Sequence, residues 1–374
     1  MVVGSTEMKF TEGEWKRGEL IGSGSFARVY KATTNPKQNY MPPLIAAKSA
    51  AISKSFTTSS IFLAKESVTL AKLQGNCPHI IGFYGPEVTI DEKGKAYFNM
   101  LLEYASLGTL GDRIRQKPGG IPEPEVQRYA RMILQGLKYV HEHEYVHCDI
   151  KPDNILLVPS SANSSSFDAI PKIADFGLAK KVGKRLKRNQ TGVSLWGTAL
   201  YVAPESVRYN EFEPHSDVWA FGISVLEMLT GKQAWTCDDE LSGLLHRVGY
   251  SDELPEIPSM LSSTAQDFVR RCLVKNSLLR WSVDMLLDHP FVAINNDKTE
   301  AGALDDAALG IPKPQLLDWR EIMVNVNSKL DANSRLTSPV KTMVKDRKHL
   351  ECGRRKRKPG YVICESIRRM LHVF

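Results

Sequence analysis

Apolar and polar residues alternate along much of the first hundred residues, which is the pattern of β-strands buried on one face. A turn with acidic residues and a glycine at 91–94 separates two of these runs, as in a β-hairpin. The segment 62–73 instead has leucines at helical spacing, with Glu66 between them. Strands are expected in the runs 18–32, 44–50, 86–90 and 96–102. This part of the chain therefore predicts a sheet with one main helix.

From residue 124 onward the apolar period becomes helical. One face of a long predicted helix carries Val126, Ala130, Ile133, Leu134, Leu137 and Val140. Further buried helices are expected at 212–229 and 263–273. A strand-rich first part joined near 103–106 to a helix-rich second part predicts an α+β fold of two lobes. Ligands commonly bind in the cleft between two such lobes.

The periodicity fades after Val292, which suggests three segments. We expect an N-terminal extension over 1–13, a folded domain over 14–292 and a mostly irregular, basic tail over 293–374. Within the domain, the N-terminal lobe would cover about 14–103 and the C-terminal lobe about 107–292. The segment 159–168 is rich in serine and asparagine and is expected to be a surface loop.

The composition is that of an ordinary globular protein, with 42% hydrophobic and 24% charged residues. No apolar run reaches the roughly 18 residues of a membrane span, and the first residues lack a secretory pattern, so an intracellular protein is expected. The net charge of +7 originates in 339–374, which holds 11 basic and 3 acidic residues. The six cysteines have no metal-ligand spacing, and free thiols are expected.

Two glycines lie inside the run 18–32, between a predicted strand that ends at Ile21 and a second one over 29–32. Gly22 and Gly24 would let backbone N–H groups approach a phosphate without obstruction by a Cβ atom. A dinucleotide-binding loop would lead into a helix and carry a third glycine, whereas this chain has Ala27 and a further strand. On its own, the motif does not distinguish a phosphate loop from a plain glycine hairpin.

A lysine lies near the end of the next predicted strand. Lys48 follows three apolar residues, and a lysine buried without an anion would be costly. Glu66 on the predicted helix could pair with Lys48, which could then reach the α- and β-phosphates of a nucleotide. An ordinary surface lysine is the alternative reading.

The run 147–154, His-Cys-Asp-Ile-Lys-Pro-Asp-Asn, carries a more specific signal. Asp149 could accept or orient the proton of a substrate hydroxyl, and Lys151 could neutralise charge on a migrating phosphoryl group. Asn154 could supply an oxygen to Mg²⁺. Asp175 follows a short predicted strand and is a hard oxygen ligand suited to Mg²⁺ between phosphates. This order and spacing indicate phosphoryl transfer.

The order of these segments resembles the eukaryotic protein kinase family over about 15–291. Further matches are Ala-Pro-Glu at 203–205, which closes the activation segment, and the block 216–222. The resemblance implies transfer of the γ-phosphoryl group of ATP with Mg²⁺, and a buried ion pair between Glu205 and Arg280. The implied catalytic residues are Asp149, Lys151, Lys48, Glu66 and Thr198, and the implied metal ligands are Asn154 and Asp175. The implied nucleotide-binding residues are Ile21, Gly22, Ser23, Gly24, Ser25, Phe26, Ala27, Val29, Ala46, Lys48, Leu102, Glu103, Ala105 and Leu156.

The acceptor follows from the same resemblance. The sequence resembles serine/threonine kinases at two places: Lys151 follows Asp149 by two residues, and Gly197 and Thr198 precede Tyr201. In such kinases the threonine hydroxyl is expected to link the residues that correspond to Asp149 and Lys151. The run 15–26 resembles MEKK-like MAP kinase kinase kinases, and the compact domain with a short tail is similar to a plant subgroup of them. The implied partner is a MAP kinase kinase. A STE20-like cascade kinase is the near alternative.

The chain departs from the family at Cys148, where most relatives have arginine. That arginine normally pairs with a phosphate on the activation segment, and cysteine offers no cation. A small buried hydrophobe would also suit the position. We therefore expect activity to depend only weakly on phosphorylation of this segment.

The stretch 180–188 of the activation segment is basic. One interpretation is a solvated face. The alternative is that its charges attract an acidic docking segment, or bind a phosphate on Thr191 or Ser194.

Two other classes of function compete with an active kinase. A nucleotide-binding pseudokinase scaffold would usually lack at least one of Lys48, Glu66, Asp149, Asn154 and Asp175, and none is missing here. A nucleic-acid-binding protein would need a folded basic surface with interleaved aromatic residues, so neither nucleic acid nor a membrane is an expected partner. The basic run 354–358 suits nuclear import as well as simple solubilisation, so a cytoplasmic protein with access to the nucleus is expected.

Overall fold

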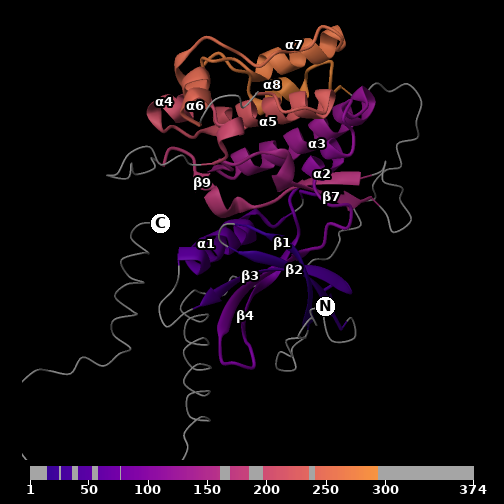
Figure 1. Cartoon of the computed structure of the whole chain (residues 1–374), viewed down its shortest axis with the longest axis vertical. Helices are drawn as coiled ribbons and strands as arrows, with labels where there is room; N and C mark the ends of the chain where they lie inside the picture. Colours follow the sequence, from indigo (N-terminus) through magenta and orange to yellow (C-terminus); the bar gives the residue numbers. More distant parts are fainter. Residues whose placement is uncertain are drawn as a thin grey trace, which may run out of the picture.

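A computed structural model describes residues 15–24, 27–35, 41–52, 58–75, 77–160, 169–184, 197–235 and 241–293. A sheet-rich lobe and a helical lobe lie one above the other, with α7 and α8 farthest from the sheet (Figure 1). The predicted two-lobed α+β fold is confirmed. The proposed division at residues 13 and 292 lies beside segments outside the described ranges and stays a prediction.

The N-terminal lobe is built on an antiparallel sheet of five strands in the order β1-β2-β3-β5-β4. Helix α1 packs against β3, β4 and β5, and its Leu63 and Leu70 share a buried cluster with Phe83 and Phe98. The elements of this lobe are β1 (Trp15–Ser23), β2 (Arg28–Thr34), β3 (Leu44–Ile52), α1 (Thr58–Leu73), β4 (Phe83–Ile90) and β5 (Ala96–Glu103).

The C-terminal lobe is mainly helical. Its helices are α2 (Leu110–Arg115), α3 (Glu123–Glu142), α4 (Pro204–Tyr209), α5 (Pro214–Thr230), α6 (Leu241–Tyr250), α7 (Ser263–Cys272) and α8 (Val283–Leu287). Its short strands are β6 (Tyr145–Val146), β7 (Ile155–Pro159), β8 (Ala169–Ile173) and β9 (Lys180–Lys181). Single 3₁₀ turns are η1 (Pro152–Asn154), η3 (Phe176–Leu178) and η4 (Ala199–Tyr201).

Helix α5 is the centre of this lobe. Every residue from Ser216 to Leu229 is buried, because α3 and α7 pack against the helix. The predicted start at 212 is wrong by two residues, since Pro214 occupies the first turn, where its missing N–H costs nothing. Gly231 ends the helix at φ 68°, a conformation that suits glycine.

The predicted apolar face of α3 is buried as expected, from Val126 to Val140. Most of the loop predicted at 159–168 lies outside the described residues, and β7 runs as far as Pro159. Within the described ranges, no helix combines the length and the apolar character needed to cross a membrane.

Candidate active site

The lysine of β3 lies between two carboxylates. Lys48 Nζ is 2.7 and 2.9 Å from the two oxygens of Glu66 on α1, so the expected ion pair is confirmed. The same nitrogen is 2.9 Å from Asp175 Oδ1. Asp175 has a left-handed backbone at φ 63°, an uncommon conformation for a residue other than glycine and one often found at functional sites. One ammonium group therefore connects the sheet, α1 and the segment after β8.

The charges of this cluster are fixed by burial and by the ion pairs. Burial would lower the pKa of Lys48, but Glu66 and Asp175 outweigh it and raise this pKa above its ordinary value. Burial likewise favours the neutral form of Asp175, yet Lys48 reverses the effect and lowers the pKa of the Asp175 carboxyl. An ionised carboxylate is thus maintained beside the ammonium group, in a form that a divalent cation can bind.

The loop between β6 and η1 forms a second cluster. Lys151 Nζ donates to Asp149 Oδ2 at 2.9 Å and to Thr198 Oγ1 at 2.7 Å, and the Thr198 hydroxyl donates to Asp149 Oδ1 at 2.8 Å. The expected link through Thr198 is therefore confirmed. Asn154 Nδ2 donates to Asp149 Oδ2 at 3.0 Å, which leaves its amide oxygen as the atom that can face a cation.

Asp217 in the first turn of α5 holds this loop. Its two oxygens accept the backbone N–H groups of His147 at 2.8 Å and Cys148 at 2.9 Å. The ring of His147 is fully buried, and its Nε2 lies 3.0 Å from the Ala174 carbonyl oxygen next to Asp175. The two clusters thus share one scaffold, and sequence reasoning assigned no role to Asp217.

The glycine segment closes one side of the site. Gly24 N donates to the Ala27 carbonyl at 2.9 Å, and the methyl group of Ala27 is buried. Ser25 and Phe26 lie outside the described residues.

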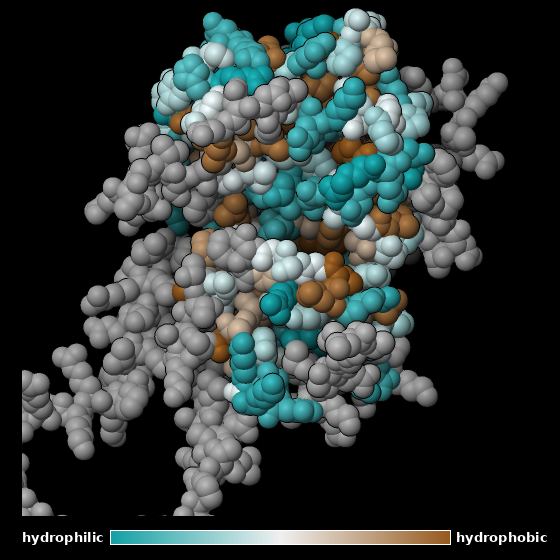
Figure 2. All heavy atoms as spheres, in the orientation of Figure 1, coloured by the Kyte–Doolittle hydropathy of each residue, from teal (hydrophilic) through white to brown (hydrophobic). Residues whose placement is uncertain are grey.

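The residues expected around an adenine ring come from strands of both lobes. Ala46 pairs with Leu102 across β3 and β5, Ile21 is 44% exposed, and Leu156 is half-buried on β7. On the face drawn in Figure 2, the surface is hollowed between the two lobes and hydrophobic atoms line the hollow. The remaining expected contacts in the described residues, which are Gly22, Ser23, Val29 and Ala105, are all at least partly exposed.

Glu103, the last residue of β5, is held from two sides. Its Oε2 is 2.9 Å from Lys172 Nζ on β8 and accepts the Gly82 N–H at 3.0 Å. The backbone N–H of Glu103 donates to the Gly82 carbonyl at 2.8 Å. Lys172 was not predicted as part of the site, because its partner Glu103 is distant in the sequence and nothing in the sequence indicates the pairing.

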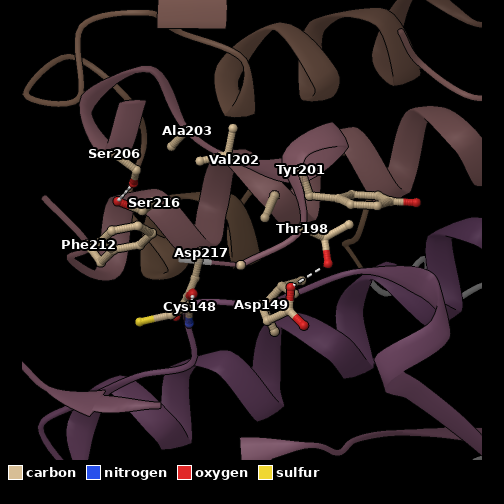
Figure 3. A pocket seen from close by; sticks show the side chains of 13 residues that line it. Cys148, Asp149, Thr198, Tyr201, Val202, Ala203, Ser206, Phe212, Ser216 and Asp217 are labelled. Atoms are coloured by element: carbon tan, nitrogen blue, oxygen red, sulfur yellow. Dashed lines mark hydrogen bonds between the residues drawn. The ribbon is translucent and has the colours of Figure 1, made fainter. Parts of the chain in front are cut away.

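A small pocket lies beside Asp149 (Figure 3). The residues that line it include Thr198, Val202, Ala203, Phe212 and Asp217. Cys148 points away from the Asp149 carboxylate. Elsewhere in this lobe, Arg280 donates to Glu205 at 2.7 and 2.9 Å, which confirms the expected buried pair.

Comparison with known proteins gives a consistent result. Residues 15–292 match the family model described as a protein kinase domain. The chain is similar to mitogen-activated protein kinase kinase kinase 20 of Arabidopsis thaliana, at 40% identity over 330 residues, which is 85% of this chain and 92% of the relative. Mitogen-activated protein kinase kinase kinase 17 of the same plant is 37% identical, over 76% of this chain and 71% of its own length. Mitogen-activated protein kinase kinase kinase 18 is 35% identical, over 84% of this chain and 87% of its own length.

Proposed function

Because the chain belongs to the protein kinase family and is a serine/threonine protein kinase, we propose that its substrate is a MAP kinase kinase, phosphorylated within a signalling cascade. Its relatives are named mitogen-activated protein kinase kinase kinases, and their similarity covers most of the chain. The proposal that this chain is catalytically competent rests on one observation. Asp149, Lys151, Thr198 and Asn154 form a single hydrogen-bonded group.

The roles of the residues follow from this group. Asp149 would take the hydrogen bond of the substrate hydroxyl and accept its proton as the phosphoryl group is transferred. Lys151 would carry a positive charge next to the moving phosphoryl group, and Thr198 would fix the orientation of the Asp149 carboxylate. Lys48 would bind the α- and β-phosphates, with Glu66 holding its ammonium group in place.

The oxygen atoms of Asn154 and Asp175 would hold Mg²⁺. Both are hard ligands, and the lowered pKa keeps the Asp175 carboxyl ionised, so the donor set suits this ion. When bound, Mg²⁺ neutralises charge on the phosphates. Gly22 and Gly24 would cover the phosphates, and the hydrophobic residues between the lobes would enclose the adenine ring.

The direct test uses purified protein, ATP·Mg²⁺ and a panel of catalytically dead MAP kinase kinases, with phosphosites mapped by mass spectrometry. Phosphorylation of activation-segment serine or threonine in at least one of them is expected. Asp149→Asn should abolish transfer and leave ATP binding intact, whereas the exposed control Asp252→Asn should retain transfer. Transfer to a generic protein but to no MAP kinase kinase would favour the STE20-like alternative. ATP binding without any transfer by the wild type would favour a pseudokinase scaffold.

The proposed location of the protein includes the nucleus as well as the cytoplasm. The supporting observation is the run of five basic residues at 354–358. Fusion of 348–358 to a fluorescent cargo should enrich the cargo in the nucleus. An unchanged distribution would leave the run a solubilising segment.

A further inference from the structure

Cys148 lies among charged side chains that come from three different elements. Lys65 of α1, Lys180 of β9, and Glu213 and Asp217 at the start of α5 all act electrostatically on its thiol. Burial, and after it Asp217, raises the pKa of this thiol well above its ordinary value. The thiol of Cys148 therefore stays neutral, and the charges in this region are those of the two lysines and the two carboxylates.

Glu213 provides the anion for the activation segment in this region. Its Oε1 is 3.0 Å from Nζ of Lys180, whose side chain is only 4% exposed. Both Glu213 oxygens also lie 3.2 Å from the backbone N–H of Gly183, in the turn that follows β9. One carboxylate thus binds a strand and a turn of the activation segment, and it prevents a buried lysine from being left unpaired.

The same end of α5 also holds the catalytic loop. Asp217, one helical turn after Glu213, accepts the N–H groups of His147 and Cys148. Strand β9 pairs with β6 just before that loop, with Val146 opposite Lys180, and Val182 N donates to the Glu144 carbonyl. Lys180 is five residues after Asp175. Fixing β9 to α5 therefore restricts the segment that carries Asp175 relative to the loop that carries Asp149.

We infer that Glu213 is a positioning residue that acts as a permanent internal anion for Lys180 and Gly183. In kinases with arginine at position 148, a phosphate on the activation segment could connect that arginine to this lysine. Here a carboxylate built into the chain makes the connection from α5, so the first part of the activation segment is held without phosphorylation. The inference extends the proposed kinase function to the regulation of the same site.

The test compares Glu213→Gln with Glu211→Gln, a matched change of an exposed carboxylate two residues away. Each full-length protein is dephosphorylated, and the absence of phosphate is checked by mass spectrometry. Wild type and Glu211→Gln should retain kcat within twofold of their untreated values. Glu213→Gln should lose tenfold or more in kcat, while KM for ATP changes less than threefold. Equal kcat values for the two variants would overturn the inference.

A second measurement is independent of kinase activity. Trypsin should cleave after Lys184 at least fivefold faster in Glu213→Gln than in wild type, at a temperature where both proteins are folded by circular dichroism. A protein that phosphorylates nothing would refute the proposed function, and this cleavage rate would still test the contact. Cleavage at the wild-type rate would overturn the inference.

Lys180→Met separates positioning from the simple cost of a buried, unpaired lysine. Glu213 still holds the Gly183 N–H in this variant, so it should lose less kcat than Glu213→Gln. The double variant should match Glu213→Gln, because the missing carboxylate is the common cause. Recovery of the double variant to within twofold of wild type would show that the unpaired lysine was the whole effect, and would overturn the positioning role.

Discussion

Arg280 offers the sharpest prediction for the stability of the C-terminal lobe. Its side chain is fully buried, and its guanidinium donates to both oxygens of Glu205 at 2.7 and 2.9 Å. It also donates to the His215 carbonyl at 2.6 Å and to the Val274 carbonyl at 2.9 and 3.0 Å. Arg280→Met would keep the apolar stem and remove all five hydrogen bonds, leaving the Glu205 carboxylate buried without its cation.

Breaking a buried pair from one side costs about 3–5 kcal/mol, which for a domain of this size corresponds to a fall in Tm of about 5–9 °C. Thermal unfolding followed by circular dichroism, with urea unfolding at 25 °C, would measure both quantities. Arg271→Met is the matched control, since Arg271 pairs with Asp267 at the surface, where a pair contributes at most about 1 kcal/mol.

Adding Glu205→Leu to Arg280→Met should restore part of the lost stability, because no buried charge then remains. The recovery should be incomplete, since Glu205 also accepts a hydrogen bond from the Ser216 hydroxyl at 2.9 Å. The reasoning fails if Arg280→Met lowers the free energy of unfolding by no more than the Arg271→Met control does.

Three further predictions concern pH, docking and the glycine segment. Burial lowers the pKa of His79 to about 4, so between pH 6.5 and 4 this residue binds a proton more readily in the unfolded chain, and its contribution to the free energy of unfolding should fall by about 2 kcal/mol from pH 7 to 5. His79→Asn should remove this part of the slope in urea titrations, and an unchanged slope would contradict the assignment. Replacing Lys184, Arg185, Lys187 and Arg188 by glutamine should raise KM for the protein substrate, because these positive charges would attract an acidic docking segment. The last three of these residues lie outside the described ranges. An unchanged KM would exclude docking at this stretch. Ala27→Gly should change ATP affinity less than tenfold, as measured by calorimetry, because Gly22 and Gly24 are the glycines expected to lie nearest the phosphates; a larger change would contradict this expectation.

The parts of the site that could be predicted are those whose chemistry requires a specific partner. A lysine in an apolar strand needs an anion, which led to Glu66 as the partner of Lys48. The cluster around Asp149 followed from one short run of the sequence, with Thr198 added by family resemblance. Strands and helices with clear periodicity, such as β5 and α3, were found for the same reason.

The parts that could not be predicted depend on contacts across long stretches of chain. Asp217 acts on the backbone N–H groups of residues about 70 positions earlier, and such groups carry no sequence signal. Glu213 and Lys180 are 33 residues apart, and the basic stretch that contains Lys180 was interpreted as a solvated face or a docking site. Folding buried this lysine and paired it, and only the three-dimensional structure provides that information.

The contact between Glu103 and Lys172 joins the end of the sheet to β8. A single carboxylate joins the end of the sheet to β8 and to the Gly82 N–H, so these three segments move together at this point. We expect a rotation of one lobe relative to the other to pivot near this contact, so that the displacement grows with distance from it. The glycine segment would swing farthest, and nucleotide exchange would take place by opening of that distant edge while the adenine end stays nearly stationary.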